Sequence, residues 1–182
     1  ALQIRTATEM ARGLGEEALP EAPPVAATEA SRQVGRPGGI RFGSLVHGVL
    51  EVIPYTSDVS VEPFVEQQAS LLAASEEEQA AAVSAVRAAI EHPLLRRAAA
   101  SLDCRRESPF VHRAGKVDCL EGTIDLVFRE DRGTESHWVV VEFKTALGDT
   151  ETARRYGVQL KVYMDAVAAA TGVSEEGTLL IV

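Results

Sequence analysis

Two stretches of sequence decide the fold: GTIDLVF at residues 122–128 and WVVVEFKT at residues 138–145. Both have the length and the β-branched or aromatic content typical of strands. Side chains alternate between the two faces of a strand. We therefore expect Asp125 to share one face with Val127, and Ile124 to be on the other face of the same strand. Both faces of the first stretch are mostly apolar, which indicates a central, buried strand.

Acidic residues are unfavourable in buried strands. An ionised Asp125 in a buried strand costs several kcal/mol unless a partner or a metal ion satisfies it. On the next strand, Glu142 and Lys144 share a face. The short connection predicts antiparallel neighbours, which can bring Asp125 close to Glu142.

Two converging carboxylates repel each other, and a divalent cation relieves that repulsion. Mg²⁺ prefers a few carboxylates together with water and phosphate oxygens. A neighbouring Lys144 then orients a water or stabilises the charged transition state of phosphodiester cleavage. The alternative from these residues alone is a buried ion pair of Lys144 with Asp125 or Glu142.

The rest of the chain predicts helices around these strands. Apolar spacing, Pro and Gly stop signals and a Ser75–Glu78 capping box define the elements. The predicted helices span 41–52, 63–74, 75–92, 94–102 and 150–171, and the predicted strands span 103–112, 117–129, 137–145 and a segment beginning near 178. The predicted turns are 113–116 and 130–136. This order predicts an α/β protein with a mixed central β-sheet flanked by helices and an N-terminal helical region.

The domain organisation follows from composition. Residues 1–39 are rich in Ala, Glu, Pro and Gly and are interpreted as a linker or poorly ordered tail, with a short helix near 7–14. Residues 40–182 form the predicted domain, and a helical insert covers about 62–101. The first residue is Ala and the last residues resemble an unfinished strand, so we expect a piece of a longer protein.

Composition narrows the function classes. The net charge of −9 argues against a protein that binds nucleic acid through electrostatic attraction alone. Two cysteines are too few for a disulfide framework, and they suit a reducing, cytoplasmic location. No apolar run is long enough to span a membrane and there is no P-loop motif, so neither a membrane partner nor ATP hydrolysis is expected.

Four motifs occur in a characteristic order: GSLVH at 43–47, the Asp125 strand, EFKT at 142–145, and Gln159-x-x-x-Tyr163. Together they resemble the PD-(D/E)XK nuclease superfamily, in its RecB branch. This branch includes the RecB- and AddA-like C-terminal nuclease domains of helicase–nucleases. The resemblance covers about residues 41–182 and implies a restriction-endonuclease-like core.

The resemblance also implies roles for individual residues. His47, Asp125 and Glu142 match the metal ligands of the family, and the backbone carbonyl of Phe143 is a further ligand. Lys144 matches the catalytic lysine. For His47 the residues alone leave open an ordinary hydrogen-bonded structural histidine.

Residues on the long helix match a further motif. Gln159 and Tyr163 lie one turn apart, and the resemblance implies that they position the substrate or the active-site strands. An ordinary half-buried tyrosine is the alternative. Arg154 and Arg155 precede them and are candidates for phosphate contacts if this helix flanks the site. Solvated surface charge is the alternative for both.

Glu107 is a further candidate for the site. It lies in RESPF at 106–110, which looks like a strand that precedes the Asp motif in related domains. An ordinary charge on a strand face is the alternative. A related group of iron–sulfur nucleases carries four cysteines around this core, and the two cysteines here exclude such a cluster.

The resemblance implies a Mg²⁺-dependent deoxyribonuclease, active with Mn²⁺ in vitro, acting as exo- or endonuclease. We expect it to cleave single-stranded DNA delivered by a helicase domain or subunit, in the same longer polypeptide, during DNA recombination and repair. The alternatives are a catalytically inactive module that binds DNA or a partner, a stand-alone nuclease that processes DNA ends, and an unrelated metal hydrolase.

Overall fold

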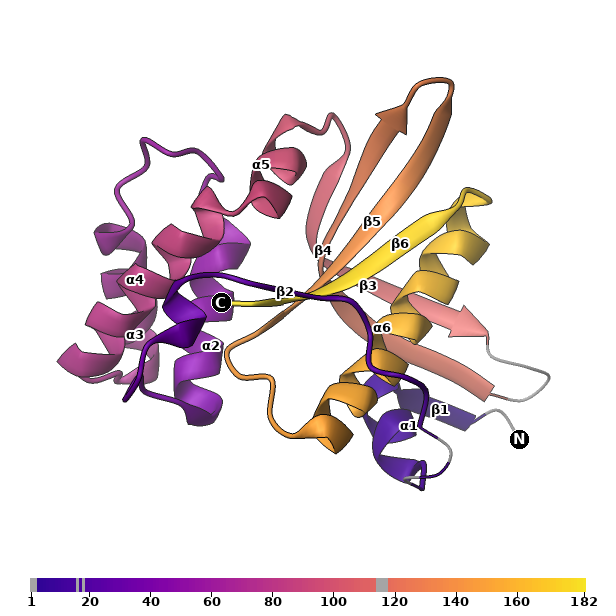
Figure 1. Ribbon diagram of the computed structural model, residues 1–182, viewed down its shortest axis with the longest axis horizontal. Helices are drawn as coiled ribbons and strands as arrows, with labels where there is room; N and C mark the ends of the chain where they lie inside the picture. Colours follow the sequence, from indigo (N-terminus) through magenta and orange to yellow (C-terminus); the bar gives the residue numbers. More distant parts are fainter. Residues whose placement is uncertain (1–2, 16, 18, 114–117) are drawn as a thin grey trace. The chain divides into compact units, whose positions relative to one another are not determined.

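The computed structural model describes residues 3–15, 17, 19–113 and 118–182 (Figure 1). The predicted turn at 113–116 lies almost wholly outside these ranges. The elements in chain order are β1 (Gln3–Thr6), α1 (Ala7–Gly13), β2 (Val25–Ala27), η2 (Ala30–Arg32), α2 (Gly39–Val52), α3 (Glu62–Leu72), α4 (Glu76–Glu91), α5 (Pro93–Ala100), β3 (Cys104–Arg113), β4 (Asp118–Arg132), β5 (Glu135–Lys144), α6 (Thr150–Thr171) and β6 (Glu175–Ile181). The predicted α/β class with a mixed sheet and flanking helices is confirmed.

Local signals placed the helix ends well. The capping box at the start of α4 is present: Ser75 Oγ accepts from the Glu78 N–H at 3.2 Å, and Glu78 Oε2 accepts from the Ser75 N–H at 2.8 Å. Helix α6 ends, as predicted, at Gly172, which has a φ of 68°. Glycine is favoured there because a Cβ is strained in the left-handed region.

The sheet has the strand order β1-β4-β5-β6-β2, and β3 pairs with β4 off this path. Strand β4 pairs in parallel with β1 and antiparallel with β3 and β5, which makes the sheet mixed. Strand β3 pairs with residues 119–128 of β4 and so occupies one edge of β4. Strands β1 and β5 must therefore share the other edge of β4. They pair there with residues 118–121 and 126–132 respectively, so residues 122–125 lie between the two paired stretches.

The interpretation of residues 1–39 as a linker or poorly ordered tail is wrong for the described part. Strand β1 pairs with β4, and the Leu179 N–H donates to the Pro24 carbonyl at 3.0 Å. Helix α1 has its own capping box between Thr6 and Glu9. Short edge strands carry little local signal because the neighbouring strand supplies most of their stability, so composition alone indicated a loop.

The chain divides into two compact units. The first contains residues 1–25, 102–142 and 147–179, and the second contains residues 26–101, 143–146 and 180–182. The second unit holds α2 to α5, so the predicted helical insert belongs to a larger helical body that also includes α2. In this unit Phe42, Leu45, Val46 and Val49 of α2 are fully buried.

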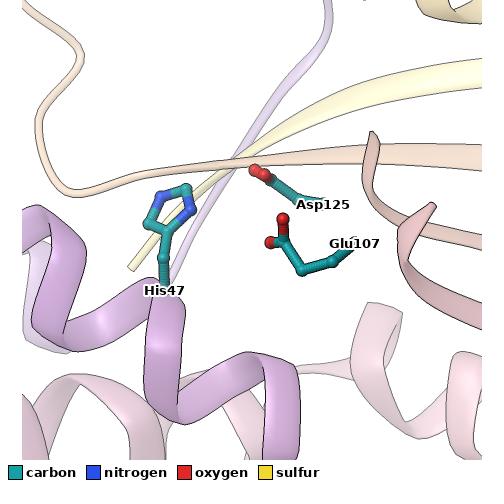
Figure 2. A group of neighbouring side chains, drawn as sticks. All are labelled: His47, Glu107 and Asp125. Atoms are coloured by element: carbon teal, nitrogen blue, oxygen red, sulfur yellow. The ribbon is translucent and has the colours of Figure 1, made fainter. Parts of the chain in front are cut away.

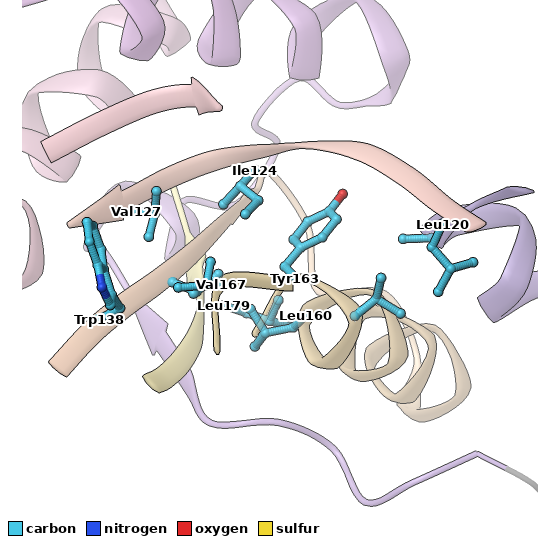
Figure 3. Packing of buried hydrophobic residues seen from close by; sticks show 11 residues of the cluster. Leu120, Ile124, Val127, Trp138, Leu160, Tyr163, Val167 and Leu179 are labelled. Atoms are coloured by element: carbon cyan, nitrogen blue, oxygen red, sulfur yellow. The ribbon is translucent and has the colours of Figure 1, made fainter. Parts of the chain in front are cut away.

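The core of the first unit forms where α6 packs on the sheet (Figure 3). Its central side chains come from three strands and one helix. They are Leu120, Ile124, Val127, Trp138, Val140, Leu160, Val162, Tyr163, Val167 and Leu179, together with Ala7. The ring of Tyr163 lies within this apolar cluster, between Ile124 and Leu120.

The predicted alternation along β4 is wrong at one place. Ile124 and Val127 pack in the same cluster, although regular alternation puts residues three apart on opposite faces. The interruption falls at Asp125, which lies across from Glu107 on β3. Glu107 has a φ of 42°, so the backbone there is not regular strand.

Candidate active site

Glu107 and Asp125 face each other across β3 and β4. The described register pairs Arg106 with Leu126 and Ser108 with Ile124, and it skips the pair between them. The skipped pair is Glu107 and Asp125. Their carboxylate oxygens lie within 4.8 Å of one another, and Figure 2 shows the two carboxylates turned toward each other.

The backbone at Glu107 is strained. A φ of 42° places this residue in the left-handed region, which costs a residue with a Cβ about 1–2 kcal/mol. Such positions cluster at functional sites, where the surrounding structure imposes them. The strand pattern around Glu107 gave no sign of this conformation. The prediction that Glu107 belongs to the site therefore gains support from its position opposite Asp125.

Glu142 lies on β5, the strand that pairs with β4 on the side away from β3. The β4–β5 register ends at Leu126 opposite Val141, and one step further along these strands come Asp125 and Glu142. The prediction that the two acids lie on adjacent antiparallel strands is confirmed. Glu142 is 3% exposed, so its carboxylate is removed from bulk water.

The three carboxylates also influence the pKa of Tyr163. Burial raises the pKa of the Tyr163 hydroxyl well above its usual range, and the Glu142 carboxylate raises this pKa further. Asp125 and Glu107 act in the same direction, because each negative charge disfavours a phenolate. The negative charges on β3, β4 and β5 therefore favour the neutral form of the Tyr163 hydroxyl on α6.

Gln159 and Tyr163 form one hydrogen-bonded pair, as their spacing on α6 allows. Gln159 Nε2 donates to Tyr163 Oη at 2.7 Å, and this bond opposes the rise in the tyrosine pKa. The Tyr163 ring is held by an edge-on contact with Phe110, with ring centroids 5.3 Å apart. A Cβ at Gly122 would come within 2.9 Å of the Phe110 ring, so glycine leaves the room that this aromatic contact needs.

His47, Phe143 and Lys144 lie in the second unit. His47 is on α2, and its ring stands edge-on to Phe143, with centroids 6.0 Å apart and planes at 85°. Lys144 ends β5, where its carbonyl accepts from the Val182 N–H at 2.9 Å. Figure 2 also labels His47, on α2. Glu142 and Lys144 are two residues apart on one strand, so local strand geometry gives their side chains the same face.

The two arginines of α6 differ in what they bind. The Arg155 guanidinium bonds to Glu151 at 2.6 Å and donates to the carbonyls of Ala11 at 2.7 Å and Leu14 at 3.3 Å. These contacts tie the end of α1 to α6, which disfavours the predicted phosphate contact of this residue. Arg154 is partly buried, and its contact with phosphate stays a prediction.

The donor set suits a hard divalent cation. Glu107, Asp125 and Glu142 offer carboxylate oxygens, which Mg²⁺ and Mn²⁺ prefer. Two unit charges held within 4.8 Å repel each other by roughly 3 kcal/mol at an effective dielectric constant of about 20. A bound divalent ion converts that repulsion into attraction, so these residues fit the metal that the sequence predicted.

Comparison with known families agrees with this geometry. The profile described as the PD-(D/E)XK nuclease superfamily matches residues 18–181, nearly the whole chain. The chain belongs to this superfamily. No curated protein matches the chain. Members of the superfamily are usually metal-dependent nucleases, so the match supports a nuclease-like function.

The superfamily name describes the two strands that decided the fold. Asp125 lies on β4, and Glu142-Phe143-Lys144 on β5 has the (D/E)-x-K spacing; the motif roles of these residues stay predictions. The match begins at residue 18, within the segment that composition had indicated as a linker. In the described ranges, no helix has both the length and the hydropathy that crossing a bilayer requires.

Proposed function

We propose that this PD-(D/E)XK domain is a divalent-metal-dependent deoxyribonuclease that hydrolyses DNA phosphodiester bonds. The proposal rests on Glu107 and Asp125, whose carboxylate oxygens lie within 4.8 Å of one another, with Glu142 on the adjoining strand β5. Two carboxylates held this close at a partly buried position are destabilising unless they serve a ligand, and a cation is the ligand they suit.

Asp125 and Glu142 hold the metal in this proposal, with Glu107 as a third carboxylate and the Phe143 carbonyl as a backbone ligand. Mg²⁺ is the physiological ion and Mn²⁺ replaces it in vitro. When bound, the ion polarises a water and the scissile phosphate. The strained Glu107 backbone keeps its carboxylate turned toward Asp125, so the donors are arranged before the ion arrives.

His47 joins these ligands in the proposal, on the strength of its place in the GSLVH motif. Its ring packs on Phe143, which directly follows Glu142 in the chain. That contact fixes the imidazole to the strand that carries the second acid. His47→Asn is therefore expected to weaken Mg²⁺ binding and to leave the fold intact.

Lys144 acts on the reacting phosphate. Its ammonium group shares a strand face with Glu142, so it stands beside the carboxylate ligand, where negative charge develops during hydrolysis. Gln159 and Tyr163 orient the substrate or the acidic strands. A tyrosine held neutral accepts the hydrogen bond from Gln159 and adds no charge to an acidic site.

Single-stranded DNA is the proposed substrate, delivered by a helicase domain or subunit in DNA recombination and repair. The net charge of −9 supports this, because a chain with an excess of negative charge captures DNA poorly without help. A partner that delivers one strand removes the need for a large basic surface. The RecB- and AddA-like order of the motifs is the second support.

The test is cleavage of labelled single-stranded DNA with Mg²⁺, Mn²⁺ or EDTA. Asp125→Asn and Lys144→Ala should each lower the rate by at least about 100-fold, since each removes a group that stabilises developing charge. Matched controls are Asp58→Asn, in an exposed loop, and Lys161→Ala, on the exposed side of α6. Both controls should keep the wild-type rate.

The contrary outcomes are also distinct. No cleavage, with DNA binding but no Mg²⁺ uptake, would identify an inactive binding module. No cleavage with clear Mg²⁺ uptake that Asp125→Asn abolishes would show an intact centre that requires its helicase partner. Cleavage that survives both active-site substitutions would overturn the proposed site.

A further inference from the structure

A second group of ligand-type side chains lies within the first unit, on three neighbouring strands. Glu130 of β4, His137 of β5 and Glu176 of β6 each offer one ligand atom, and these atoms lie within 4.8 Å of one another. Along β5, His137 precedes Glu142 by five residues, which is about 17 Å at the rise of a strand. This group is therefore separate from the carboxylates of the proposed nuclease centre.

His137 is buried in an unusual way. The residue is 8% exposed, and its Nε2 atom is buried with no hydrogen-bond partner among the described residues. Glu130 Oε2 lies 3.4 Å from this nitrogen, which is long for a charge-assisted hydrogen bond. Buried polar atoms without a hydrogen bond are rare, so this nitrogen calls for a ligand.

The spacing suits two ligands on one ion. Zinc binds imidazole nitrogen and carboxylate oxygen at about 2.0–2.2 Å in a tetrahedral arrangement. Two such ligands on one ion stand roughly 3.4 Å apart, from the tetrahedral angle and these bond lengths. The distance from His137 Nε2 to Glu130 Oε2 is 3.4 Å.

The sheet fixes the positions of these side chains. Glu130 and His137 are directly paired across β4 and β5. The Trp138 N–H donates to the Ser174 carbonyl at 2.9 Å, which fastens β5 to the segment that leads into β6. A surface hollow opens beside His137 and gives an ion access from solvent; it is lined by Glu135, Ser136, His137, Ser174, Glu175 and Glu176.

We propose that Glu130, His137 and Glu176 bind a zinc-class transition-metal ion, with water in the fourth position, as a structural clamp across β4, β5 and β6. An imidazole ligand favours zinc and its neighbours over Mg²⁺, which prefers oxygen donors. The ion would hold the β4–β5 hairpin to the last strand, because all three elements contribute a ligand.

The test is zinc retention after dialysis of the purified chain against a weak chelator. Wild type should retain about one more zinc equivalent than His137→Asn. Glu176→Gln should weaken zinc binding at least tenfold in a competitive titration. Because Glu176 is partly exposed, this variant keeps the test valid if His137→Asn, at a buried position, folds poorly. Replacing zinc with Co²⁺ should give the intense visible absorption of a four-coordinate ion, and His137→Asn should lose it.

Three controls separate this site from other sources of binding. Asp125→Asn removes a nuclease-centre ligand and should keep the Co²⁺ absorption. His112→Asn and Glu91→Gln remove a histidine and an exposed acid outside both the trio and the hollow, and both should keep the zinc. Equal zinc content and equal Co²⁺ spectra in wild type, His137→Asn and Glu176→Gln would overturn the proposal and leave an ion-paired trio without a metal.

Discussion

Glu107 stands opposite Asp125 across β3 and β4, at the one place where the described register between these strands skips a pair. The two carboxylates face each other, and the Glu107 backbone has a φ of 42°. Strain and like-charge repulsion therefore act on the same residue. The backbone strain and the charge repulsion both lower the stability of the fold. Residues that destabilise the fold in this way are typical of functional sites.

The first prediction concerns this strain. Glu107→Gly should be more stable than Glu107→Ala by about 1 kcal/mol, because glycine adopts a positive φ without penalty. At an ordinary strand position the order reverses, so Val111→Gly should be less stable than Val111→Ala. Urea unfolding of the four variants measures this. The same order of stability at both positions would contradict a left-handed Glu107.

The second prediction concerns Tyr163 and pH. Its pKa in the folded protein is raised by burial, while the unfolded value is about 10. Above pH 10 the unfolded chain loses this proton first, so the free energy of unfolding should fall as pH rises from about 10 toward the folded pKa. Tyr163→Phe should remove that part of the decrease. The check is urea unfolding of both proteins between pH 8 and pH 11, and parallel curves would contradict the assignment.

The third prediction concerns the room at Gly122. Gly122→Ala places a Cβ within 2.9 Å of the Phe110 ring and should cost about 1–3 kcal/mol. Phe110→Leu in the same chain should recover part of this loss, because the shorter side chain vacates the space. Thermal unfolding of the two single variants and the double variant gives the coupling. Strictly additive losses would show that the two positions do not compete for space.

The fourth prediction separates the two arginines of α6. Arg155→Ala should destabilise the first unit by about 1–2 kcal/mol and expose the end of α1 to proteases, since two carbonyls lose their donor. Its effect on DNA affinity, once folding is controlled for, should be small. Arg154→Ala should leave stability unchanged. A reduced salt dependence of DNA binding in Arg154→Ala would support its contact with phosphate.

The acidic strands could be predicted because their signal is local. A buried strand with one acid, followed by a turn and a strand with Glu-x-Lys, gave the neighbours Asp125 and Glu142 from alternation and chain reversal alone. Helix α6 and its Gly172 end were equally accessible, since capping and periodicity depend on nearby residues. The pairing of Gln159 with Tyr163 follows from their spacing of one turn.

Two errors came from tertiary effects. Residues 1–39 were interpreted as a tail because strands of three or four residues have no pattern of their own, and β4 and β6 supply their partners. The faces of Ile124 and Val127 were assigned by strict alternation, which β4 does not keep near Asp125. The trio of Glu130, His137 and Glu176 gave no sequence signal at metal-ligand spacing, because its members come from three strands.

The sequence by itself determined the class of the fold, most of the elements and the Asp and Glu-x-Lys motif, because those features depend on periodicity and on contacts between chain neighbours. Only the tertiary structure decided that Glu107 faces Asp125 in a left-handed backbone, that Arg155 ties α1 to α6, and that a buried His137 meets two glutamates. Each of these depends on contacts between residues far apart in the chain, and no local preference specifies which distant partner a side chain will meet.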